Sequence, residues 1–193
     1  MGAQARIDDP LRSRFEARRL ERVFADCFRT ELRTRLQGGA PEPLYQPAAS
    51  EDGEHILYYR DDFFASALHE IAHWCIAGPE RRRLLDFGYW YAPDGRSPAQ
   101  QQAFEAVEEK PQALEWFFCK ACDYRFRISV DNLEDEGRLP DTTSFQRRLL
   151  ARVRLLQREG LPPRAERFYR ALCREFGTAI ASAELCFSGE ELV

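Results

Sequence analysis

The sequence lacks the long apolar run of roughly 18 residues that a membrane-spanning helix needs. It also lacks a strong excess of one charge, because 28 Lys and Arg residues stand against 32 Asp and Glu residues and give a net charge of −4. This balance favours neither nucleic acid nor an anionic membrane surface as a partner. We therefore expect no nucleic acid and no membrane among its partners.

Two further absences concern where the protein works. Residues 1–10 are polar and lack the apolar core of a secretory signal, so we expect them to form a flexible N-terminus. The six cysteines lie in or beside apolar segments and are too sparse for a disulfide scaffold. Both features predict a cytoplasmic protein with reduced thiols.

Histidine is scarce, yet two of the three histidines, His69 and His73, flank Glu70 in an H-E-x-x-H motif. On a helix, residues four apart share one face, so both imidazoles can bind one metal ion. Apart from the motif, Ser66 is the only polar residue in the segment 63–77, which predicts a buried helix. Buried imidazoles need partners, and a metal ion satisfies both. A pair of core histidines without a metal is the alternative.

Apolar spacing and turn signals predict one helix-rich α+β domain with a small sheet over residues 11–183, followed by a loose tail at 184–193. Helices are expected at 11–36, 63–77, 98–109, 111–122, 143–158 and 163–176. One or two short strands are expected within 41–59, and one each at 87–91 and 126–130. Expected helix boundaries are Gly38-Gly39 after the first, Asp61 or Asp62 before the second, Ser97-Pro98 before the third, and Pro111 between the third and fourth.

Two histidines from one helix leave a metal site incomplete, and a carboxylate from another segment would complete a 2-His-1-carboxylate triad. The richest source is the acidic stretch after Phe104. Glu108 lies four residues after Phe104 and one after Val107, so it shares their inward side, whereas Glu109 points more outward. Glu108 is therefore the best candidate for the third ligand, and Glu105 is the second.

The motif alone is commonest in zinc peptidases, in which Glu70 would be the general base. The extended form of that motif would need glycine at Ile76 and histidine at Pro79, and the sequence has neither. A peptidase with a distant glutamate ligand stays open on the pattern. Cys119-x-x-Cys122 lies in an apolar helical segment, where core packing explains it better than half of a thiolate zinc site.

Beyond the motif, a series of blocks resembles the bacterial elongation factor P hydroxylases over roughly residues 18–176. In order, these blocks are 69–78, 86–91, 93–96, 107–108, 110–114, 131–134 and 145–148. The resemblance implies a non-haem Fe(II) enzyme with molecular oxygen as co-substrate. It also implies a fold similar to a metal-dependent bacterial endoribonuclease rather than a double-stranded β-helix. The implied substrate is elongation factor P that carries a β-lysyl group on its modified lysine.

The resemblance places the metal triad on His69, His73 and Glu108. Glu70 would then act as a catalytic or substrate-facing group beside the metal. A pocket of carboxylates and aromatic rings would suit the long cationic arm of the substrate. Candidates for this pocket are Asp86, Tyr89, Tyr91 and Asp131. Two alternatives stay open: a zinc-dependent peptidase or ribonuclease, and a non-catalytic metal-stabilised module that binds the translation machinery.

Overall fold

The structure is a computed structural model that describes residues 14–86, 96–129, 142–178 and 181–192. The described helices are α2 (Ala17–Leu32), α3 (Phe64–Ile76), α4 (Pro98–Cys122), α5 (Thr143–Glu159) and α6 (Pro163–Phe176). The strands are β1 (Thr34–Ala40), β2 (Leu44–Gln46) and β3 (His55–Arg60), and the short 3-10 helices are η1 (Arg81–Arg83), η2 (Ser182–Glu184) and η3 (Gly189–Leu192). This content confirms the expected helix-rich α+β domain. No described helix is both long and apolar enough to cross a membrane.

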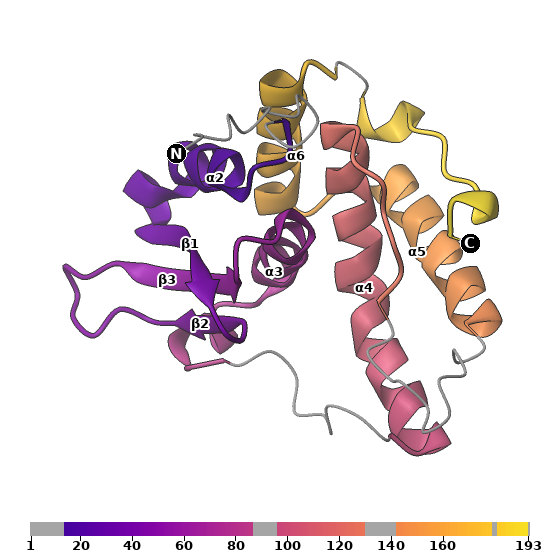
Figure 1. Ribbon diagram of the computed structural model, residues 1–193, viewed down its shortest axis with the longest axis horizontal. Helices are drawn as coiled ribbons and strands as arrows, with labels where there is room; N and C mark the ends of the chain where they lie inside the picture. Colours follow the sequence, from indigo (N-terminus) through magenta and orange to yellow (C-terminus); the bar gives the residue numbers. More distant parts are fainter. Residues whose placement is uncertain (1–13, 87–95, 130–141, 179–180, 193) are drawn as a thin grey trace, which may run out of the picture.

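The sheet has the strand order β1-β3-β2, with β1 parallel and β2 antiparallel to β3. Leu57 in the central strand lies opposite Leu36 on one side and Tyr45 on the other. All three side chains are buried, so this row faces the core. The α3 helix packs between the sheet and α4, and it also contacts α2 and α6 (Figure 1). The motif helix is therefore at the centre of the domain, as its apolar sequence predicted.

The first helix ends earlier than the predicted range of 11–36. Arg33 adopts a left-handed conformation with φ 44°, and the chain continues directly into β1. The two glycines lie within this strand instead of ending a helix. A Cβ on Gly38 would come within 2.6 Å of the Tyr59 hydroxyl, and Gly39 has φ 82° where the β1–β3 register shifts. The sheet requires both glycines, through close packing and a bulge.

Neither predicted aspartate caps α3. Asp61 adopts a left-handed conformation with φ 46°, and Phe63, whose side chain cannot accept a hydrogen bond, is the residue at the helix N-cap. Ser97 does begin α4 as predicted, because its hydroxyl accepts from the backbone of Gln100 while the Gln100 side chain accepts from the Ser97 backbone at 2.9 Å. This reciprocal pair is a capping box.

Pro111 does not separate two helices, because α4 is continuous from Pro98 to Cys122. A proline in a helix lacks the N–H that would bond to the carbonyl four residues earlier. Residues 111–119 are all buried, and this packing keeps the helix intact through the proline. The expected helices at 143–158 and 163–176 are confirmed by α5 and α6, and Gly160 and Gly177 follow their ends.

The strand expected at 126–130 is absent from its described part, residues 126–129, which have no regular secondary structure. Phe126 instead packs singly, with its ring stacked at 5.3 Å from that of Trp116 on α4. Burial of Phe126 and partial burial of Ile128 against the core thus account for the apolar signal. The strand expected at 87–91 and the N-terminus at 1–10 lie outside the described residues.

The C-terminal segment, which was expected to be loose from residue 184, packs against the helices. Leu185 and Leu192 are buried, and the ring of Phe187 lies 4.9 Å from that of Trp116. The indole N–H of Trp116 also donates to a carboxylate oxygen of Glu191 at 3.3 Å. Apolar burial therefore holds most of this segment, despite its polar appearance in the sequence.

The end of α3 is fastened by Arg164 from α6. Its Nη2 donates to the carbonyl of Cys75 at 3.0 Å and also contacts the carbonyl of Ala77. Its guanidinium lies 4.7 Å from the centre of the Trp74 ring. Carbonyls at a helix end have no partner inside the helix, so a charged donor there is stabilising.

Replacing Arg164 with alanine should lower the free energy of unfolding by about 1.5–3 kcal/mol, because charge-assisted hydrogen bonds and a ring contact are lost. Urea denaturation followed by circular dichroism would measure this. Arg170→Ala on the same helix is the matched control, since the Arg170 side chain is 69% exposed and pairs with Glu166 one turn away. That control should change stability by less than about 0.5 kcal/mol. Equal effects of the two variants would contradict the fastening role.

Candidate metal centre

The structure brings together the three predicted ligands, His69 and His73 from α3 and Glu108 from α4. The two Nε2 atoms lie 3.0 Å apart. The carboxylate oxygens of Glu108 lie 3.3 Å from His73 Nε2 and 3.5 Å from His69 Nε2. Ligand atoms about 2.1 Å from a shared ion are about 3.0 Å apart at octahedral angles and about 3.4 Å apart at tetrahedral ones. The arrangement therefore fits a single ion with either geometry.

Helix packing selects Glu108 from the acidic residues around it. Glu108 is 3% exposed and faces α3, on the same side of α4 as the buried Phe104. Glu105 and Glu109 face α5 instead, where they pair with Arg148 at 2.6 Å and Arg152 at 2.7 Å. Glu105, the second candidate for the ligand, is thus an inter-helix ion-pair partner.

Glu115 belongs to the site, and sequence reasoning missed it. Its Oε2 lies 2.8 Å from Nδ1 of His69, and its side chain is nearly buried. A carboxylate at Nδ1 accepts the proton there and leaves Nε2 free to bind a metal, while also fixing the ring orientation. Glu115 is therefore a positioning residue for His69.

Gln112 supports the other side of the triad. Its amide donates to Glu108 Oε2 at 3.2 Å and to the carbonyl of Ser129 at 2.7 Å. Its Oε1 accepts from the Ser129 backbone at 3.1 Å. Glu108, Gln112 and Glu115 lie at i, i+4 and i+7, on one face of α4. Three polar residues at this spacing in a buried run form the signal that could have revealed the site.

The electrostatics of the group suit a cation. Burial disfavours the charged form of His69, but the hydrogen bond and charge of Glu115 outweigh this effect and raise its pKa to about 10. Burial also opposes the charge of Glu108, while the hydrogen bond from His73 and the charge of His69 lower its pKa to about 2. The buried carboxylate of Glu108 thus stays ionised because positive charge is close. A divalent cation between the ligands meets the same demand.

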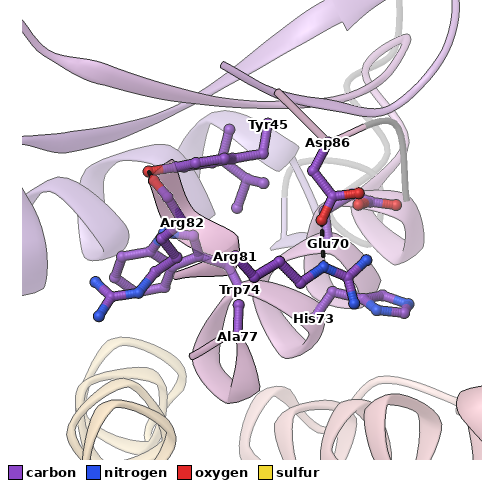
Figure 2. Close-up of a pocket in the computed structure, with 9 residues that line it drawn as sticks. Tyr45, Glu70, His73, Trp74, Ala77, Arg81, Arg82 and Asp86 are labelled. Carbon is purple, nitrogen blue, oxygen red and sulfur yellow. Dashed lines mark hydrogen bonds and ion pairs between the residues drawn. The ribbon is translucent and has the colours of Figure 1, made fainter. Parts of the chain in front are cut away.

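A pocket adjoins the triad on the His73 side (Figure 2). Its lining residues are Tyr45, Leu57, Glu70, His73, Trp74, Ala77, Arg81, Arg82 and Asp86. Burial raises the pKa of the Glu70 carboxyl to about 7, although the charge of His69 opposes this shift. Glu70 lines the pocket beside His73 and does not belong to the group of three candidate ligands.

Of the four predicted substrate-binding residues, the structure places Asp86 in this pocket, where it forms an ion pair with Arg81. Tyr89, Tyr91 and Asp131 lie outside the described residues. Both cysteines of the Cys119-x-x-Cys122 motif are buried within α4, and burial raises the pKa of both thiols. Their packing agrees with the core role expected for them.

Comparison with known proteins identifies the family to which this chain belongs. The family model for elongation factor P hydroxylase matches residues 23–185. The elongation factor P lysine hydroxylase of Haemophilus influenzae is 47% identical over 156 residues, which cover 81% of this chain and 86% of that protein. The chain belongs to the elongation factor P hydroxylase family. The resemblance found in the sequence is thus confirmed, and the matched span includes the triad, Gln112 and Glu115.

In this member of the elongation factor P hydroxylase family, His69→Ala or Glu108→Ala should abolish tight binding of a divalent metal and leave a folded protein. The reason is that each variant removes one of three ligands, while the surrounding core is unchanged. Metal content by elemental analysis and far-ultraviolet circular dichroism would measure the two effects. Glu109→Gln is the matched control on α4, and it should bind metal normally. Normal metal content in Glu108→Ala would contradict the triad.

Glu115→Ala should weaken metal affinity by about 10–100-fold, because His69 loses the group that orients it. Glu115→Gln should weaken affinity less, since an amide oxygen can still accept the Nδ1 proton. Competition with a chromogenic chelator would measure both affinities. If both variants bound metal as tightly as the unaltered protein and only their free energy of unfolding fell, Glu115 would be a packing residue and not a positioning residue.

Proposed function

We propose that the protein hydroxylates a lysine side chain of elongation factor P. Fe(II) would be its bound metal and molecular oxygen its co-substrate. The observation that carries this proposal is the His69–His73–Glu108 group in a chain of this family. The relative from Haemophilus influenzae is named an elongation factor P lysine hydroxylase. Since translation occurs in the cytoplasm, we place the activity there.

The donor set is compatible with iron. Two imidazoles and one carboxylate on one side of an ion leave further coordination positions open, as in other non-haem iron oxygenases. Bound Fe(II) would supply the activation of oxygen that hydroxylation of a carbon requires. His69, His73 and Glu108 would hold the ion, and Glu115 would keep His69 oriented. Zinc fits the same spacing but offers no redox chemistry.

The pocket supports a cationic substrate arm. Glu70 and Asp86 place two carboxylates beside His73, and the rings of Tyr45 and Trp74 form part of the wall (Figure 2). Carboxylates attract ammonium groups, and an apolar wall packs against the alkyl part of such an arm. We propose that these residues orient the β-lysyl-lysine arm toward the metal and exclude water from it. Tyr89, Tyr91 and Asp131 remain predicted contributors to this contact.

Glu70 is also the residue that favours the alternative function, a zinc-dependent hydrolase. A carboxyl with a pKa of about 7, next to a metal site, suits the general base of a zinc hydrolase. In the hydroxylase that we propose, Glu70 instead attracts the substrate arm. Glu70→Gln should therefore raise KM for the modified substrate more than it lowers kcat. If the protein were instead a hydrolase with Glu70 as its general base, the same substitution would mainly lower kcat.

Intact-mass spectrometry of elongation factor P tests the proposed function. β-Lysylated elongation factor P, incubated with the protein, Fe(II), oxygen and a reductant, should gain the mass of one oxygen atom. Omission of oxygen, replacement of Fe(II) by Zn(II), and the Glu108→Ala variant should each abolish this gain. Elongation factor P without the β-lysyl group is the substrate control. A mass gain that persists with Zn(II), or cleavage of the substrate, would contradict the proposal.

A further inference from the structure

The pocket beside the triad already contains a cation from the protein. In Figure 2 the Arg81 side chain extends toward Asp86, and its guanidinium lies near the carboxylate of that residue and the ring of His73. Within the described residues, the Glu70 carboxylate in the same pocket makes no hydrogen bond or ion pair. The pocket thus has two carboxylates, and Arg81 pairs with one of them.

The space that remains is small. With Arg81 in place, the pocket has a cavity volume of about 30 Å³, which is room for one or two water molecules. An alkyl ammonium group needs more room than this, and it seeks the same carboxylates as Arg81 does. An incoming ammonium group and the Arg81 guanidinium therefore compete for the same carboxylates in this pocket.

The ion pair between Arg81 and Asp86 is partly open to solvent. The Arg81 side chain is 39% exposed and that of Asp86 is 20% exposed, so solvent screens the ion pair. Arg81 also lies on the short η1 element, where a change of rotamer disturbs no long helix. The neighbouring arginines behave differently: Arg82 points away from Arg81 in Figure 2, and Arg83 pairs with Glu80 at the surface. Arg81 alone of the three extends toward Asp86.

We propose that the Arg81 guanidinium occupies the position beside Asp86 and Glu70 at which the ammonium group of the substrate binds, and that it moves out when the substrate enters. We call Arg81 the resident cation of this pocket. This inference rests on the proposed function for the identity of the substrate arm. Arg81 then acts as a specificity-determining residue, because a ligand must offer a cation together with enough further contacts to displace it. In the free protein, Arg81 also balances the charge of Asp86 beside the metal ligands.

Binding of 1,5-diaminopentane to the full-length metal-free protein, followed by nuclear magnetic resonance titration, tests the resident cation without any turnover. Arg81→Ala should bind the diamine about two- to fivefold more tightly than the unaltered protein, because no ion pair has to be broken. Arg81→Gln, which keeps most of the side-chain volume, should shift affinity in the same direction. Arg83→Ala removes the same charge from the same 3-10 helix and should leave affinity nearly unchanged.

Unchanged or weaker diamine binding by both Arg81 variants would overturn the proposal, and so would equal tightening by Arg83→Ala, which would be a general charge effect. The same variants should lower KM for β-lysylated elongation factor P by a similar factor. If the unaltered protein fails to hydroxylate elongation factor P, the proposed function fails. The diamine titration still decides the role of Arg81 in that case.

Discussion

The contact between α3 and α4 is the constraint on which the rest of this structure depends. It places two imidazoles from one helix against two carboxylates from the other in an interior from which water is largely excluded. Such a group is costly to bury unless its charges are paired. The sheet, α2 and α6 surround α3, and α5 holds the far side of α4 through Glu105 and Glu109. The fold therefore keeps four ionisable groups in register.

The three candidate ligands could be brought together from the sequence because each lies on a helix with buried apolar residues. His69 and His73 follow from helical spacing, and Glu108 follows from its distance to Phe104. One premise was wrong, since Val107 is 38% exposed and does not mark the inward side. The position of Phe104 alone selects the same glutamate. Phe104 therefore predicts which glutamate lies against the two histidines, and Val107 does not.

Other features could not be read locally because they depend on contacts between distant segments. Glu115 looks like a polar residue in an apolar run until His69 is placed against it. The strand β1 looks like the end of a helix, because only pairing with β3 explains why its glycines are needed. Phe126 predicted a strand, but its ring belongs to the packing around Trp116. In each case a tertiary contact outweighs the local preference.

The central position of α3 would link metal supply to protein lifetime if the proposed ion binds there. An ion bound by His69, His73 and Glu108 would join the helix that packs on the sheet to the helix that packs on α5 and α6. It would act as a cross-link between the two parts of the core. A ligand that binds the native state alone stabilises it by about 2.7 kcal/mol at one hundred times its dissociation constant. Cells short of the metal would then hold a protein that unfolds more often and is degraded sooner. The amount of the enzyme, and not only its activity, would follow the metal supply.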